Sequence, residues 1–188
     1  MFVKIKKITE QQKMIFVSCF IWTLVAHGTI LFNKISFHDD IEGIFSVGST
    51  YTLGRWFLGI LGSVFGTVFG GLYSVPVWYG LLSIIFIAIA TCLLVEIFDI
   101  QNKSSLIVIS GIMVTIPVVT ALFGFMFTAP FYLLGMLMAT RGAYLLIKGS
   151  NKRDSILGIV FICLGCGVYQ VYFTFAVGIL YLSLFLYT

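Results

Sequence analysis

Apolar runs of transmembrane length alternate with short polar segments along most of the chain. An apolar run of about 20 residues can cross the hydrocarbon core of a bilayer as one helix. The pattern predicts transmembrane segments at 14–32, 76–98, 106–127, 130–147 and 156–188. Pro117 should kink the third segment, and the last segment exceeds one ordinary span. We therefore expect a fifth helix and the beginning of a sixth, with a break near Gly165 to Gln170.

A polar stretch, residues 33–55, and an apolar stretch interrupted by glycines, 56–75, separate the first two spans. If 56–75 does not cross the membrane, most positive charges lie on one side, as the positive-inside rule requires. The predicted cytoplasmic side then carries Lys4, Lys6, Lys7, Lys13, Lys103, Lys148, Lys152 and Arg153, and the outer side carries Lys34 and Arg55. We expect a cytoplasmic N-terminus, with 56–75 as an interfacial or re-entrant helix. Residues 33–75 then form an extracytoplasmic loop with interfacial helices.

The composition supports a membrane protein. Hydrophobic residues make up 60% of the 188 residues and charged residues 10%, and the mean hydropathy is +1.11. Soluble domains carry about 25% charged residues, so a soluble or disordered chain is excluded. A transmembrane barrel would need short segments of alternating polarity, which the long apolar runs contradict. The sequence predicts an all-α, polytopic transmembrane bundle of five to six spans in one domain, 1–188, with no nucleic-acid partner.

Two adjacent carboxylates, Asp39 and Asp40, follow His38 in the predicted outer loop. Apolar residues recur after them at helical spacing, which indicates a short amphipathic helix. Carboxylates at the N-terminus of such a helix are favoured by its dipole, which would be a purely structural role. Neighbouring residues on a helix point about 100° apart, so one carboxylate would face a reacting centre and the other an orienting partner or metal.

Arg55 lies between Gly54 and Trp56, where the outer loop re-enters apolar sequence. Arg and Trp commonly anchor a chain at a membrane interface, and anchoring alone would explain them. Alternatively, the guanidinium binds a lipid phosphate, Gly54 allows close backbone approach, and Trp56 stacks on a sugar or prenyl chain. A carboxylate, a guanidinium and an aromatic ring at one interface suit transfer from a lipid-linked phosphosugar.

Tyr169 and Gln170 lie about 14 residues into the predicted fifth helix. A rise of 1.5 Å per residue places them roughly 20 Å from Asp154, toward the outer face, where the loop residues are expected. An uncharged Gln can also serve only to bond a neighbouring helix.

Other residues in the apolar runs have structural interpretations. Arg141 is expected to pair with Glu96, because an intramembrane Arg needs a partner. His27 is expected to make a helix-packing hydrogen bond, and Cys163 and Cys166 to pack as small apolar residues rather than to form a metal or redox site. Gly62, Gly66 and Gly70 are spaced by four, which suggests close helix packing or a bend.

Three segments, in this order, resemble the polytopic O-antigen-modifying glucosyltransferases of the serotype-converting type: LFNKISFHDDIEG, TLGRWFLGIL and LGCGVYQVYF. The resemblance implies a GT-C type enzyme of the bacterial inner membrane. Such an enzyme moves glucose from undecaprenyl phosphoglucose to a surface polysaccharide at the periplasmic face. It implies Asp39 and Asp40 as catalytic residues. The substrate-binding residues it implies are His38, Gly54, Arg55, Trp56, Tyr169 and Gln170.

The resemblance also implies partners. Beside the polyprenyl-phosphate donor, the polysaccharide acceptor and membrane lipid, these are a small flippase and a cytoplasmic enzyme that charges the prenyl carrier. No cofactor is assigned with certainty, and a divalent metal on the two aspartates stays open as an alternative, although two carboxylates give one ion a thin oxygen shell. Members of this family are much longer, so we expect the N-terminal part of such an enzyme. The alternative is a non-catalytic membrane subunit, such as a lipid-flippase component, or an inactive fragment.

Overall fold

The computed structural model describes residues 9–33, 47–69 and 75–187, and the regular elements in these ranges are all α-helices. In chain order they are α1 (Glu10–Phe32), α3 (Val47–Thr52), α4 (Trp56–Phe69), α5 (Pro76–Ile97), α6 (Lys103–Thr115), α7 (Pro117–Gly124), α8 (Ala129–Lys148), α9 (Lys152–Val168) and α10 (Val171–Tyr187). The all-α polytopic class predicted from the sequence is confirmed.

Three of these helices, α1, α5 and α8, are long and apolar enough to cross a membrane. Helices α6 and α7 together make a fourth candidate span, bent by 48°. Pro117 begins α7, and Ile116 before it is extended, at ψ 142°, because proline disfavours the α conformation in the residue that precedes it. The kink predicted at Pro117 is confirmed and is a complete break between two helices. A second break separates α9 from α10, within the predicted segment Gly165 to Gln170.

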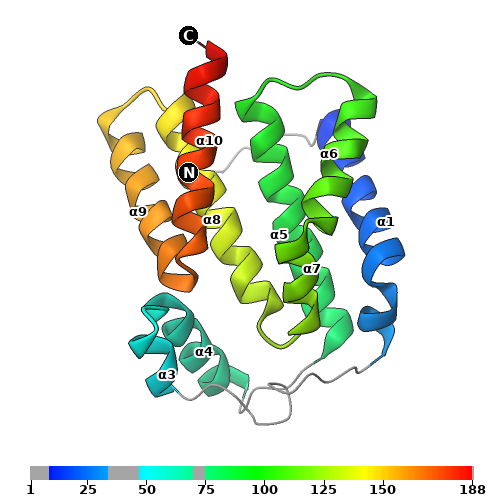
Figure 1. The fold of residues 1–188 in the computed structure, drawn as a ribbon, viewed down its shortest axis with the longest axis vertical. Helices are drawn as coiled ribbons and strands as arrows, with labels where there is room; N and C mark the ends of the chain where they lie inside the picture. Colours follow the sequence, from blue (N-terminus) through cyan, green and yellow to red (C-terminus); the bar gives the residue numbers. More distant parts are fainter. Residues whose placement is uncertain (1–8, 34–46, 70–74, 188) are drawn as a thin grey trace, which may run out of the picture.

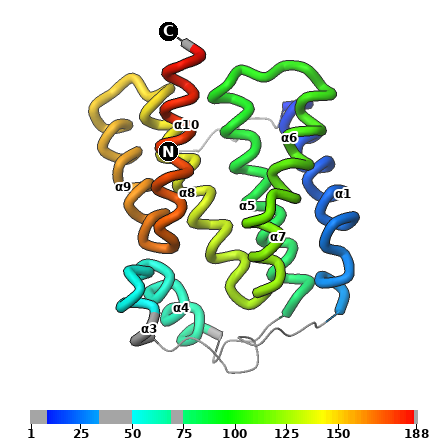
Figure 2. Tube along the Cα trace, viewed as in Figure 1, coloured from blue at the N-terminus to red at the C-terminus, as the bar shows by residue number. Residues whose placement is uncertain are grey.

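The helices form a bundle with α8 near its middle (Figure 1). Helix α8 packs against α5 on one side and against α9 and α10 on the other, and α1 packs against α5 and α6. Figure 2 shows the same arrangement as a tube, with α9 and α10 on the left and α1, α6 and α7 on the right. Helices α3 and α4 lie at the lower end, beneath α9 and α10. With 14 residues, α4 is shorter than the roughly 20 residues that a span requires.

Glycines allow the backbones of α8 and α9 to touch. A Cβ built at Gly142 would lie 2.6 Å from the carbonyl oxygen of Gly158, and one at Gly165 would lie 2.8 Å from that of Gly135. Small residues at such positions let membrane helices approach closely. The glycine ridge predicted on α4 behaves differently, because a Cβ at Gly66 would meet nothing within 4 Å. Gly70 lies outside the described residues, so the close packing predicted for this ridge is wrong at Gly66.

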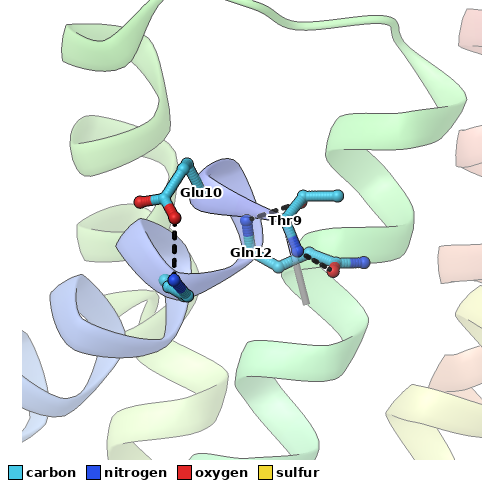
Figure 3. Close-up of polar contacts among 4 residues, drawn as sticks. Thr9, Glu10 and Gln12 are labelled. Carbon is cyan, nitrogen blue, oxygen red and sulfur yellow. Dashed lines mark hydrogen bonds and ion pairs between the residues drawn. The ribbon is translucent and has the colours of Figure 1, made fainter. Parts of the chain in front are cut away.

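The first helix begins earlier than the apolar run that predicted it, because polar residues cap it (Figure 3). Gln12 donates its backbone N–H to the Thr9 hydroxyl over 3.2 Å, and Thr9 donates its own N–H to the Gln12 side-chain carbonyl over 3.0 Å. This reciprocal pair satisfies two backbone donors of the first turn. Lys13 adds an ion pair with Glu10 at 2.7 Å. Hydropathy alone could not place this start.

A tyrosine lies between the two charged residues expected to pair inside the membrane. The Arg141 guanidinium carbon lies 5.1 Å from the centroid of the Tyr144 ring, and the Tyr144 hydroxyl donates to a Glu96 carboxylate oxygen over 2.7 Å. Among the described residues Arg141 forms no ion pair with Glu96, so the direct pairing predicted from the sequence is wrong. Instead, an aromatic face accommodates the charge of Arg141, and Tyr144 links it to Glu96.

Candidate active site

A tight turn at Gly54 joins α3 to α4 and aims Arg55 at the bundle. Gly54 has φ +74°, and the backbone N–H of Arg55 donates to the Thr50 carbonyl over 2.9 Å. Glycine adopts this left-handed conformation without the steric penalty of a side chain. A Cβ at Gly54 would also lie 2.8 Å from the Gln170 side-chain nitrogen. The conformation therefore favours glycine here, and the Gln170 amide would have to shift to admit a larger residue.

The side chain of Gln170 ties this turn to the break between α9 and α10. Its amide nitrogen donates to the carbonyl oxygen of Leu53. Tyr169, the residue before it, is extended at φ −156° and ψ 127°, and its side chain lies beside Arg55. Gln170 thus links the break between α9 and α10 to the turn before α4 through the backbone of Leu53.

Two tyrosines hold the guanidinium of Arg55. Its Nη1 donates to the Tyr132 hydroxyl over 3.0 Å, and its guanidinium carbon lies 4.9 Å from the centroid of the Tyr169 ring. The two tyrosine rings meet edge to face, with centroids 5.5 Å apart. The side chain is partly buried, and its Nε finds no partner among the described residues. A guanidinium has five N–H donors, so Arg55 retains donors for an anionic ligand.

Arg55 opens into a pocket of about 550 Å³, called here the arginine pocket. Its polar lining residues are Thr50, Arg55, Thr128, Tyr132 and Tyr169. Its apolar lining residues are Leu53, Leu58, Val118, Ala121, Leu122, Phe125, Phe127 and Val171. The α7 members Val118, Ala121 and Leu122, with Phe125 directly after that helix, form what we call the apolar wall. The pocket is therefore amphipathic, with a cation at one part of its lining.

Trp56 faces a different cavity. A Cβ at Gly167 of α9 would lie 2.5 Å from the Trp56 indole, so the ring packs closely against that glycine. Trp56 lines a second, apolar groove of about 410 Å³ together with Cys163, Cys166 and Phe173. The indole is not among the residues that line the arginine pocket.

The predicted site residues are brought together in part. The turn between α3 and α4 and the break between α9 and α10 meet at one end of the bundle. They bring together four of the predicted residues, Gly54, Arg55, Tyr169 and Gln170. The acidic pair and His38 lie outside the described residues. Within the described ranges, no group of three His, Cys, Asp or Glu side chains is arranged to hold a metal ion. The four cysteines are free thiols.

Tyr132 and Thr128 were not predicted as site residues from the sequence. Both lie where α8 begins, beside Pro130, and both line the arginine pocket. A tyrosine two residues after a proline at the start of an apolar run is a polar group at the end of a span, near the depth expected for Arg55. That position is the signal by which Tyr132 could have been found.

The fold and the pocket define a helical, multi-pass membrane protein with an arginine in the lining of an amphipathic pocket. The family model of the glucosyl transferase GtrII matches residues 28–187. The chain therefore belongs to this family of glucosyl transferases, as the resemblance predicted. No curated protein and no solved structure matches the chain significantly.

Proposed function

We propose that the chain transfers glucose from a polyprenyl-phosphate donor to a surface polysaccharide, the O-antigen, at the extracytoplasmic face of the bacterial inner membrane. The observation that carries this proposal is the partly buried guanidinium of Arg55, whose Nε has no partner among the described residues and which lines one pocket with the apolar wall. A prenyl phosphosugar has the matching parts, an anionic phosphate next to a long hydrocarbon chain. The family supports glucose as the sugar.

Arg55 would bind the donor phosphate. The Tyr132 hydroxyl and the Tyr169 ring fix one nitrogen and one face of the guanidinium, so the remaining N–H groups need little rearrangement to meet a phosphate. When the bond between the anomeric carbon and the phosphate oxygen breaks, its electron pair stays on the prenyl phosphate. A preorganised cation stabilises the charge that develops there, and the prenyl phosphate needs no general acid because it leaves as an anion.

A carboxylate of the outer loop would supply the base. Asp39 or Asp40 accepts the proton of the acceptor hydroxyl while the oxygen of that hydroxyl attacks the anomeric carbon. A positioned base typically contributes a factor of about 10² to 10⁴. Asp40 precedes Thr50, a pocket-lining residue, by only ten positions in the chain. This short separation supports the assignment of the acidic pair to the same site.

The lipid setting supports the remaining partners. Apolar helices of span length indicate a multi-pass protein, so donor and acceptor would be presented at a membrane surface. We further propose a GT-C type enzyme with a cytoplasmic N-terminus, and with the small flippase and the prenyl-charging enzyme of the resemblance as partners.

The test is the mass of surface polysaccharide from cells that supply undecaprenyl phosphoglucose. Expression of the chain should add one hexose per repeat unit, and Asp39→Asn or Asp40→Asn should abolish the gain at unchanged membrane abundance. Arg55→Lys should reduce it, since lysine keeps the charge but loses the planar set of donors. If the well-inserted chain adds no hexose, it is a non-catalytic subunit or an incomplete enzyme. Equal transfer by both aspartate variants would disprove the catalytic assignment.

A further inference from the structure

A buried histidine contacts both halves of the broken span. His27 on α1 is 2% exposed, and its Nε2 lies 3.1 Å from the Val114 carbonyl oxygen near the end of α6. A carbonyl oxygen only accepts, so Nε2 carries the hydrogen and donates it. The imidazole also stacks on the Phe123 ring of α7, with centroids 4.3 Å apart and an angle of 7° between the planes. The hydrogen bond expected for His27 is thereby confirmed.

The break at Pro117 creates the need for this hydrogen bond. Helix α6 ends at Thr115, so Val114 lies in its last turn, where carbonyls lack a partner from the next turn of the same helix. An unsatisfied carbonyl among apolar helices costs free energy, because the bilayer core has no water to replace the partner. His27 supplies that partner from another helix, and so stabilises the bent arrangement over a continuous helix.

The stacked ring connects the histidine to the pocket. Phe123 is fully buried and precedes Phe125 by two residues on the segment that forms the apolar wall. The imidazole holds α6 through Val114 and α7 through Phe123. A change in the 48° bend would move the apolar wall relative to Leu58 and Arg55, which line the same pocket from α4 and from the turn before it.

We infer that His27 is a positioning residue of the arginine pocket, fixing the α6–α7 bend and with it the place of the apolar wall. Its link to catalysis rests on the proposed function, in which that wall contacts the hydrocarbon chain of the donor. Loss of His27 should then affect recognition of the lipid chain, without affecting the groups that contact the sugar or the phosphate.

The geometry can be tested without any enzymatic activity. Leu58→Cys and Leu122→Cys place one thiol on α4 and one on the wall, in a chain whose four native cysteines are replaced by serine or alanine. A short bifunctional thiol reagent should join them when His27 is present. His27→Ala and His27→Phe should lower the yield, since both remove the donor to Val114, whereas His27→Gln should keep much of it through its side-chain amide.

Thr23→Val is the matched control. Thr23 is buried on the same helix, but its hydroxyl donates only to the Cys19 carbonyl within α1, over 2.7 Å. Its cross-linking yield should match that of the parent. A yield for His27→Ala and His27→Phe equal to that of Thr23→Val would overturn the inference. If His27→Ala does not accumulate in the membrane, the comparison of His27→Phe with His27→Gln decides the question.

A kinetic measurement then separates positioning from bulk destabilisation. With a long-chain prenyl phosphoglucose, His27→Phe should raise KM roughly tenfold or more at nearly unchanged kcat, because a shifted binding surface weakens productive orientation. With a donor of one or two isoprene units, its KM should equal that of the parent. An equal rise for both donors would contradict a role through the wall. If even the parent transfers no glucose, the proposed function fails, and the cross-linking result alone decides the role of His27.

Discussion

The Tyr132 hydroxyl accepts a 3.0 Å hydrogen bond from Nη1 of Arg55, which precedes it by 77 residues. This bond joins the turn before α4 to the first turn of α8. Tyr169, from the break after α9, covers the same guanidinium with its ring. Three segments that are distant in the sequence thus converge on one cation, which is typical of a binding site and unnecessary for interfacial anchoring.

Removal of the Tyr132 hydroxyl should impair transfer without unfolding the bundle. Tyr132→Phe keeps the ring contact with Tyr169 but leaves Nη1 of Arg55 without this acceptor. A hydrogen bond to a charged group contributes about 1.5–3 kcal/mol, so we expect kcat/KM to fall by roughly tenfold or more. Tyr144→Phe is the control, because that hydroxyl bonds Glu96, which lies outside the arginine pocket. A matched loss in both variants would disprove the role of Tyr132.

Gly54→Ala should destabilise the turn. The left-handed conformation costs a residue with a side chain about 1–2 kcal/mol, and the new Cβ would also press on the Gln170 amide. Thermal unfolding in detergent should therefore shift to lower temperature, and glucose transfer should fall with it. Gly66→Ala in α4, where the added methyl meets open space, should leave the midpoint unchanged or raise it. The prediction is contradicted if Gly54→Ala is as stable as Gly66→Ala.

A bulky residue at Gly142 should separate α8 from α9. Gly142→Leu would place its side chain against the Gly158 carbonyl and Ile162, and overpacking typically costs about 1–3 kcal/mol. We expect lower membrane abundance and faster proteolysis of the α8–α9 loop. Gly178→Leu on α10, where nothing lies within 4 Å, should retain parental abundance. Equal abundance of the two variants would exclude close α8–α9 packing in the membrane.

The orientation can be tested with single cysteines. In a chain without native cysteines, Ser46→Cys should react with an impermeant thiol reagent in intact cells. Asn151→Cys, in the exposed loop between α8 and α9, should react only after permeabilisation. The reverse labelling pattern would invert the predicted topology.

The sequence predicted the helical elements well because each depends on local chemistry. Apolar length indicated α5 and α8, and Pro117 indicated the break between α6 and α7. The contacts between helices depend on register, which one sequence does not contain. Gly135 and Gly142 on α8 meet Gly165 and Gly158 on α9 only in one antiparallel alignment. The ridge of glycines spaced by four on α4 looked more like a packing surface, yet Gly66 faces open space.

The candidate site was predictable to a similar extent. Arg55 and Tyr169 stood out because charged and polar groups are rare in this chain, and the structure brings them together. Trp56 was expected beside the ligand, but a helical turn of about 100° per residue directs it to the groove on α9 instead. Tyr132 was missed because a lone tyrosine in an apolar run resembles any interfacial aromatic.

The convergence on Arg55 also sets an order for assembly. Arg55 is synthesised early, while Tyr169 and Gln170 follow more than a hundred residues later. At about 5–20 residues per second, on the order of ten seconds pass between the synthesis of Arg55 and that of Tyr169 and Gln170. Only then can the Tyr169 ring contact and the Gln170 hydrogen bond to Leu53 form. During that interval the turn at Gly54 lacks both, so the pocket closes only when α9 has been inserted and the chain has turned back into α10. Assembly of the arginine pocket is therefore among the last steps of folding for this part of the molecule.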